Sequence, residues 1–573
     1  MKFGLFFAGA LCAQITLAGD SSLTIADDAA KALSARDYAG AVRMYREALA
    51  ENAANPEYQD ALGMALAGLG QLSDAIGSVN RALAIEERPT FYYHLGLLSI
   101  QTGDRRNGIR ALENAIRLDR DAWEAKYALS EQCSQAGDLE GAILSLEQVV
   151  HQRPRLAIAR LDLALTWMQL ERNDQESLRQ LLVATTIEPE NPRTHLALGE
   201  VYAGRNDYDR AIRELKRAVD LDPGNPEGHY NLGLAWRLDG RLDQAELELQ
   251  RALDLKPGHA LAHKALGLVL REKDNLAGAR DQLLESVNAD AGDAEAQHLL
   301  GSVLLKLGDA ESATHHLLAA VRLNPVLTEA YSVLAAAYGK LGRADDASQA
   351  RSQAEASREI KARAGQSIIL LQESNQRRSA GDKAGAVSAL RRAIQLSPEF
   401  SEGAFQLATL LSTSVDSAVE AEHLYRRVVE INPKYAKAYV GLGAILLRTK
   451  RDQEGESVLR HALEMAPSVV EAHLELGKLA LTRKNFAEAA SEYGAALAWQ
   501  PDNTDARVQR GRALAGGGSY KAAELELKAC VLENPSADAY HYLGVVLERT
   551  GRRSEATAAF RASQQLKYNN PPY

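Results

Sequence analysis

The chain has 573 residues and a formal net charge of −10, and 46% of its residues are hydrophobic, 6% aromatic and 25% charged. Abundant alanine and leucine with few aromatic residues favour helices joined by short turns over β-sheets. Acidic and basic residues are interspersed, so the chain has no basic block that would attract a phosphate backbone, and we predict that nucleic acid is not a partner.

An apolar segment begins the chain. The run from Phe3 to Leu17 follows Lys2, and the small residues Ala18 and Gly19 come next. This pattern predicts a signal peptide at residues 1–18 and export to the periplasm or beyond the cell. The run is too short for an ordinary membrane span, and no other segment approaches the roughly 18 apolar residues that a span needs. The alternative is an apolar N-terminus without a targeting role in a cytoplasmic protein.

The central part of the chain repeats itself every 34 residues. Alanine recurs at this interval from Ala211 to Ala347, proline recurs from Pro433 to Pro535, and glycine recurs at Gly199, Gly233, Gly267 and Gly301. In one common register, small residues occupy positions 8, 20 and 27, larger apolar residues occupy positions 11 and 24, and proline occupies position 32. The three series therefore belong to one repeated structural unit.

The spacing within each unit predicts two antiparallel helices. Apolar residues follow a 3.6-residue period over positions 2–14 and again over positions 17–30, with a short polar turn between them. Small residues are expected where the helix axes approach closely, and proline at position 32 ends the second helix because it lacks a backbone donor. One unit cannot bury its own apolar face, so neighbouring units must stack.

These residues resemble the tetratricopeptide repeat family. The clearest copies begin at Pro192 and Pro226 and carry the signature residues Gly199, Ala211, Ala218, Pro223, Gly233, Ala245, Ala252 and Pro257. The resemblance covers residues 22 to 566 in about sixteen units. It implies an all-α solenoid of stacked helix-turn-helix repeats that forms a right-handed superhelix.

The register predicts how the chain is organised. A first array of about ten repeats occupies residues 22–355, a helical joint occupies 356–366, a second array of about six repeats occupies 367–566, and a flexible tail occupies 567–573. Two repeats need one extra residue, near Asn173 and Val415. The polar run within residues 348–375 has two open interpretations: it breaks the array, or it forms one longer helix inside a continuous solenoid.

The resemblance also implies a binding groove. In this family the first helix of each repeat lines a concave face, and the corresponding residues here are Tyr93, Leu97, Tyr127, Glu131, Tyr230, Leu234, Arg237, Lys264, Leu268 and Arg271. Tyrosine and leucine beside charged groups are typical of surfaces that anchor peptides. The three basic residues would suit an acidic peptide or a terminal carboxylate. The alternative is that these positions are ordinary solvated helix faces.

No motif predicts catalysis. His195, His229, His263 and His473 share position 4 of their repeats, which indicates helix packing and not a metal site. The glycine-rich segment 516–519 lacks phosphate-loop spacing and falls at an ordinary inter-helix turn. Cys12, Cys133 and Cys530 are too far apart in an elongated stack for a disulfide. We predict no catalytic residue, no cofactor and no metal.

The predicted function is a non-catalytic scaffold that binds protein or peptide segments in the groove. Two alternatives stay open, an accessory subunit of a bacterial envelope export or assembly machine and a regulatory partner of a separately encoded glycosyltransferase. The sequence names neither the partner nor the oligomeric state.

Overall fold

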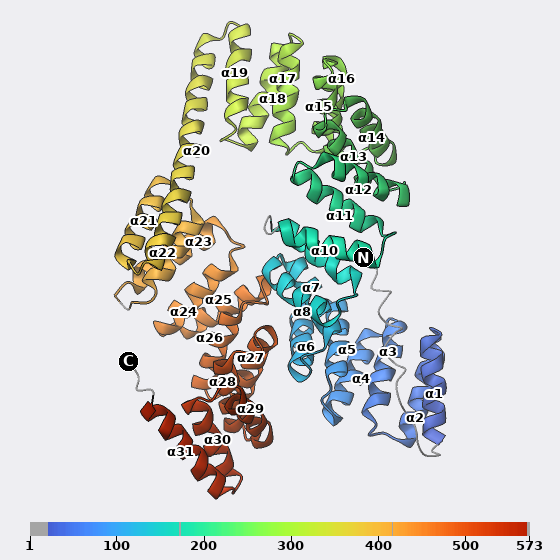
Figure 1. Ribbon diagram of the computed structural model, residues 1–573, viewed down its shortest axis with the longest axis vertical. Coiled ribbons are helices and arrows are strands. Elements are labelled where there is room, and N and C mark those ends of the chain that lie inside the picture. The colour runs from blue at the N-terminus through green and yellow to red at the C-terminus, as the bar shows by residue number, and fades with distance from the viewer. Residues whose placement is uncertain (1–20, 171–173, 415, 570–573) are drawn as a thin grey trace. The chain divides into compact units, whose positions relative to one another are not determined.

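The computed structural model describes residues 21–170, 174–414 and 416–569 (Figure 1). The predicted signal peptide at residues 1–18 and the predicted insertions near Asn173 and Val415 fall outside the described residues. Thirty-one α-helices and no strands lie within the described ranges. The prediction of an all-α repeat fold is therefore confirmed.

Contacts divide the chain into two compact units, which we call unit 1 (residues 1–154 and 434–573) and unit 2 (residues 155–433). The described helices of unit 1 are α1 (Ser21–Ser34), α2 (Tyr38–Glu51), α3 (Pro56–Gly68), α4 (Leu72–Ile85), α5 (Pro89–Gln101), α6 (Arg105–Leu118), α7 (Trp123–Ala136), α8 (Leu139–Gln152), α24 (Ala436–Arg448), α25 (Asp452–Met465), α26 (Val470–Thr482), α27 (Phe486–Trp499), α28 (Thr504–Gly516), α29 (Tyr520–Glu533), α30 (Ala537–Arg549) and α31 (Arg553–Asn569).

The described helices of unit 2 are α9 (Ala157–Gln169), α10 (Asp174–Ile187), α11 (Pro192–Gly204), α12 (Tyr208–Leu221), α13 (Pro226–Leu238), α14 (Leu242–Leu255), α15 (Ala260–Glu272), α16 (Leu276–Ala289), α17 (Ala294–Lys306), α18 (Ala310–Leu323), α19 (Thr328–Lys340), α20 (Ala344–Ser379), α21 (Lys383–Leu396), α22 (Ser401–Leu411) and α23 (Ala418–Ile431).

The small residues lie where the helices of a pair meet. Ala245 and Ala252 of α14 are fully buried, and a Cβ added to Gly233 of α13 would lie 2.7 Å from Cγ of Leu249. A contact this short leaves no room for a larger side chain. The packing therefore explains why the repeat keeps glycine and alanine at these positions.

Turn chemistry sets the ends of the helices. The chain reverses within a pair through a residue in the left-handed region, such as Gly240 (φ 80°) or Asn206 (φ 59°), a conformation that glycine and asparagine tolerate best. The side chain of Asn225 then accepts a hydrogen bond from the backbone N–H of Glu227 and caps α13, in which Pro226 is the first residue. The repeat length follows from these stops.

Helix α20 belongs to two neighbouring pairs. It is 36 residues long and packs against α19 through its first part and against α21 through its last part (Figure 1). Residues 358–366 in its middle are all exposed. This sharing explains how about sixteen predicted repeats are built from thirty-one helices.

The predicted domain boundaries stay predictions. Residues 348–375 lie inside the continuous helix α20, so a longer helix accounts for the irregular register there. At the C-terminus α31 continues to Asn569 and thus includes the first residues of the predicted tail. No helix of the described ranges is long and apolar enough to cross a membrane.

Candidate functional site

The predicted groove residues of unit 2 lie on two adjacent first helices. Tyr230, Leu234 and Leu268 are half-buried and pack against the core of the unit. The Tyr230 ring also lies against the imidazole of His259, with 5.1 Å between ring centroids. The structure therefore brings an aromatic and two aliphatic side chains of α13 and α15 to one partly open face.

The basic residues of this face already have acidic partners. Nζ of Lys264 lies 2.8 Å from Asp293 Oδ2 and 2.9 Å from Glu295 Oε2. Burial by itself would lower the pKa of Lys264, but these two bonds raise it.

Arg237 is paired in the same way, since its Nη1 lies 2.7 Å from Glu272 Oε1. The charge of Arg271 acts on His298, whose pKa is lowered by burial and by this cation. Two of the three predicted cations are thus neutralised within the unit.

The remaining predicted groove residues belong to unit 1. Tyr93 and Leu97 lie on α5, while Tyr127 and Glu131 lie on α7. Burial raises the pKa of Tyr93 to about 12, with contributions from Glu124 and Glu131. The charge of Glu131 thus acts on Tyr93, but the predicted groove residues are divided between two units.

The position-4 histidines follow a shared pattern of packing. Nδ1 of His195, His229 and His263 bonds to a glutamate or glutamine 19 residues later, at 2.7 to 2.8 Å. Their Nε2 bonds to the proline carbonyl oxygen six residues earlier, at 2.9 to 3.2 Å. Each histidine thus links both helices of its own repeat to the end of the preceding repeat, which is a structural role.

His473 departs from this pattern. Its Nδ1 bonds to Glu492 Oε2 at 2.7 Å, as the pattern requires. Its Nε2, however, has no hydrogen-bond partner and lies 3.7 Å from Oε1 of Glu113 on α6. The sequence predicts the same packing role for all four histidines. In the structure, His473 differs from the other three because Glu113, from a distant part of the chain, lies beside it.

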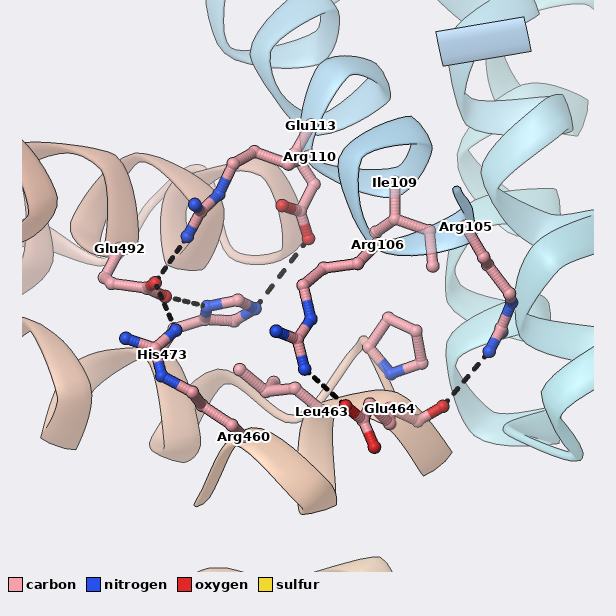
Figure 2. A pocket seen from close by; sticks show the side chains of 11 residues that line it. Arg105, Arg106, Ile109, Arg110, Glu113, Arg460, Leu463, Glu464, His473 and Glu492 are labelled. Carbon is pink, nitrogen blue, oxygen red and sulfur yellow. Dashed lines mark hydrogen bonds and ion pairs between the residues drawn. The ribbon is translucent and has the colours of Figure 1, made fainter. Parts of the chain in front are cut away.

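The surroundings of His473 form a polar cluster, which we call the Glu113 cluster (Glu113, His473, Glu492, Arg110 and Trp499; Figure 2 shows the first four), and all of its members except Arg110 are buried. The indole Nε1 of Trp499 donates to Glu113 Oε1 at 3.0 Å, and Nη2 of Arg110 lies 2.6 Å from Glu492 Oε1. Helices α6, α26 and α27 supply its members. The cluster therefore joins N-terminal and C-terminal repeats within unit 1.

Burial and charge shift the pKa values in opposite directions in this cluster. Burial raises the pKa of Glu113. Burial alone would lower the pKa of His473 and raise that of Glu492, but their hydrogen bond and mutual attraction prevail, so the pKa of His473 is raised and that of Glu492 is lowered. The geometry thus favours a protonated imidazole beside an ionised Glu492.

Further bonds hold the same two parts of unit 1 together. Asp138 caps α8 through the N–H of Gly141 at 3.0 Å, and its carboxylate also accepts bonds from N and Oγ of Ser468 at 3.1 and 3.0 Å. Lys437 and Glu140 form an ion pair at 2.7 Å. The Glu113 cluster therefore lies inside an extended interface and not at an isolated contact.

A cavity of about 190 Å³ opens beside the cluster, and we call it the arginine-lined cavity. Figure 2 shows its lining side chains, which are Arg105, Arg106, Ile109, Arg110, Glu113, Arg460, Leu463, Glu464, Pro467, His473 and Glu492. Helix α6 supplies one wall, and α25, α26 and α27 supply the other. The sequence does not predict this site, because it depends on contacts between repeats far apart in the chain.

One signal in the sequence could have indicated the contact. Second helices commonly end in leucine or isoleucine that is 37–47% exposed, as at Leu118, Leu255 and Leu323, whereas α27 ends in Trp499, which is 2% exposed. A tryptophan at an ordinarily exposed position indicates that something covers it.

A thiol close to the site is not in its reactive form. The nearby Cys133 is buried, and burial together with Asp138 raises its pKa well above the usual value, so the thiolate form is disfavoured. Among the described residues, no group of three or more histidine, cysteine, aspartate or glutamate side chains is arranged to hold a metal ion. Its arrangement suits binding and helix docking.

Comparison with known families agrees with the geometry. A tetratricopeptide repeat model matches residues 29–90, 93–157, 196–260, 240–294, 420–469 and 453–506, and related models match 294–326 and 480–544. The chain belongs to the tetratricopeptide repeat family. Repeats of this family generally mediate contacts between proteins, and their stacked scaffold is typically non-catalytic.

Solved structures resemble parts of this tetratricopeptide repeat protein. MamA is 27% identical and covers 29% of this chain and 96% of its own, with a TM-score of 0.28. PilF of Pseudomonas aeruginosa is 21% identical and covers 37% and 96%, with a TM-score of 0.34. YrrB, described as a TPR protein with an unusual peptide-binding site, is 20% identical and covers 32% and 95%, with a TM-score of 0.28. A comparison with curated proteins finds no match.

Proposed function

We propose that this protein is a non-catalytic scaffold that binds a segment of a partner protein on the face formed by α13 and α15. The supporting observation is the half-buried set of Tyr230, Leu234 and Leu268, which packs on the core and still reaches solvent. Tyrosine is among the side chains that most often dominate the binding energy of protein interfaces, and apolar neighbours help by excluding water.

The charges on this face narrow the chemistry of the partner. Because Lys264 and Arg237 are paired with carboxylates of the same unit, an acidic segment would have to displace Asp293, Glu295 or Glu272. The partner segment is therefore apolar or aromatic and not strongly acidic. This proposal departs from the expectation from sequence that Arg237, Lys264 and Arg271 bind an acidic peptide or a terminal carboxylate.

The test compares partner capture by matched variants. The double variant Tyr230→Ala, Leu268→Ala should lose partners that the unaltered chain captures from its native host. Leu247→Ala is the control, because Leu247 lies on the second helix α14 and is 53% exposed. Circular dichroism should show equal helicity in all three proteins. Capture of the same partners by the double variant would contradict the proposal.

We also propose that the N-terminal segment directs export. The support is the apolar run that ends at Leu17 before Ala18 and Gly19. N-terminal sequencing of the protein purified from its host should give a chain that starts at Gly19 in the exported fraction. A full-length chain confined to the cytoplasm would contradict this.

A further inference from the structure

Two buried nitrogen atoms without hydrogen-bond partners belong to residues that line the arginine-lined cavity. They are Nε2 of His473 and Nε of Arg105. Buried polar atoms in proteins nearly always have a partner, so two orphans at one cavity need an explanation. His473 as a residue is only 6% exposed.

The other position-4 histidines show which hydrogen bond Nε2 of His473 would be expected to make. In His195, His229 and His263 the corresponding Nε2 bonds to the proline carbonyl oxygen six residues earlier. The equivalent proline, Pro467, is present here, but Nε2 of His473 has no hydrogen bond to it. His473, which lines a cavity, thus lacks the local hydrogen bond that the other three position-4 histidines make.

The cavity combines this polar atom with apolar walls. Its volume of about 190 Å³ is far above the roughly 10–15 Å³ that a single water needs, but below the roughly 300–1,000 Å³ of ordinary drug-sized sites. Ile109, Leu463 and Pro467 form the apolar part of the lining. The size and the walls fit a small molecule with a short aliphatic part.

The charged residues that line the arginine-lined cavity favour an anionic ligand. Arg106 pairs with Glu464, and Arg110 pairs with Glu492. Arg105 donates to the carbonyl oxygens of Gln132 and Glu464, and no carboxylate of the described residues lies within ion-pair distance of it. The lining therefore carries an excess of cationic groups.

The same lining limits the charge of the anion. Glu113, Glu464 and Glu492 also face the cavity and would repel a dianion such as hydrogen phosphate. Burial raises the pKa of Glu113, which favours its neutral form. A singly charged carboxylate meets these conditions better than a phosphate group.

We propose that the arginine-lined cavity binds a short-chain aliphatic carboxylate. The carboxylate accepts a hydrogen bond from Nε2 of His473 and is favoured by the positive charge of the lining, while the alkyl chain lies against Ile109, Leu463 and Pro467. This site lies in unit 1, whereas the proposed partner surface lies in unit 2, so each proposal can fail without the other.

The experiment titrates the full chain with butyrate by isothermal titration calorimetry. Saturable one-site binding is expected, and His473→Gln should weaken it at least tenfold. Glutamine occupies the same repeat position natively at Gln297, where its side chain bonds to a carbonyl oxygen six residues earlier, so this variant is expected to fold. The matched control is His229→Gln, which should bind butyrate as the unaltered chain does, because both nitrogens of His229 are already bonded.

Two further arms keep the proposal falsifiable if His473→Gln fails to fold. Leu463→Phe should block the cavity and abolish butyrate binding, and the imidazole NMR signal of His473 should shift on titration of the unaltered chain. Failure of butyrate to bind, equal binding by His473→Gln, or tighter binding of phosphate would overturn the proposal. Tighter binding of an acetylated tetrapeptide that ends in valine would overturn the assignment to a small acid.

Discussion

The indole of Trp499 donates a 3.0 Å hydrogen bond to Oε1 of Glu113, across 386 positions of sequence. Both residues are buried, and the carboxyl group of Glu113 also lies 3.7 Å from Nε2 of His473. The bond gives the buried carboxyl group of Glu113 a partner, and burial of this group without a partner would cost free energy. Together with the ion pair of Arg110 and Glu492, it therefore holds α6 against α27.

Replacement of this tryptophan should destabilise unit 1. Trp499→Phe keeps an aromatic ring but leaves the buried Glu113 without its indole donor, so we expect a loss of about 1–3 kcal/mol in the free energy of unfolding. Chemical denaturation followed by circular dichroism measures it. Adding Glu113→Leu to Trp499→Phe should recover part of the loss, since both polar partners are then gone. Equal stability of Trp499→Phe and the unaltered chain would contradict this role.

The stability of unit 1 should fall as pH rises above 6.5. The pKa of His473 is raised by Glu492 and Glu113 against burial, so the folded state binds the proton more tightly than the unfolded state. This contribution is present below the unfolded pKa of about 6.5 and is lost as pH rises through the raised pKa of the folded state. The raised pKa of Glu113 acts with the same sign, whereas Glu492, whose pKa is lowered, contributes at higher pH and loses its effect in acid.

Hydrogen exchange of peptides from α27 between pH 6 and pH 8.5 tests this, after correction for the intrinsic rate. The charged groups that face His473 are Glu113 and Arg110 of α6, Glu492 of α27 and Arg460 of α25. In His473→Gln, the protection of α27 against hydrogen exchange should decrease less as pH rises. His229→Gln should leave it unchanged. A slope that persists in His473→Gln would assign the effect to another group.

A large side chain at a position that the repeat register assigns to a small residue should destabilise the protein. Ala245 is fully buried, and its carbonyl oxygen lies 3.3 Å from a Cβ built on Gly233. Ala245→Trp should therefore cost at least about 1–3 kcal/mol in stability. Ala277→Trp is the control, because Ala277 lies on the second helix of the next repeat and is exposed. Equal melting temperatures of the two variants would show that the register is wrong.

Two glycines should respond to alanine with opposite signs. A Cβ on Gly141 would lie 2.5 Å from Cβ of Ser468, whereas a Cβ on Gly77 would meet only the end of Arg81, at 3.7 Å. Gly77→Ala should stabilise the chain by roughly 0.5–1 kcal/mol, because alanine loses less entropy in a helix. Gly141→Ala should destabilise it, because α8 must move away from Ser468. A gain in melting temperature for Gly141→Ala would indicate that this contact yields easily.

The sequence predicts the repeated part of this structure well, because each pair of helices depends on local spacing. Gly233, Ala245 and Pro257 mark positions whose neighbours lie within a few tens of residues, so their roles can be inferred from the repeat alone. Position-4 histidines were likewise expected to pack, and His195, His229 and His263 do so.

The Glu113 cluster could not be predicted in this way. Its partners lie in different repeats, and no spacing rule connects α6 with α26 and α27. The residues concerned obey the repeat pattern locally, as His473 does through Glu492, and depart from it only through a contact with a distant helix. The predicted groove residues stay predictions for a similar reason, since exposure on a face does not name the molecule that covers it.

Helix α20 has a consequence for how unit 2 opens. Its ends are packed against α19 and α21, while its middle, residues 358–366, is exposed. Thermal opening of one end need not reach the other, because the middle buries no side chain. The single helix α20 would then belong to two cooperative folding units, one at each of its ends. A protease that cuts after basic residues could reach Arg358, Lys361 and Arg363 in the exposed middle between them.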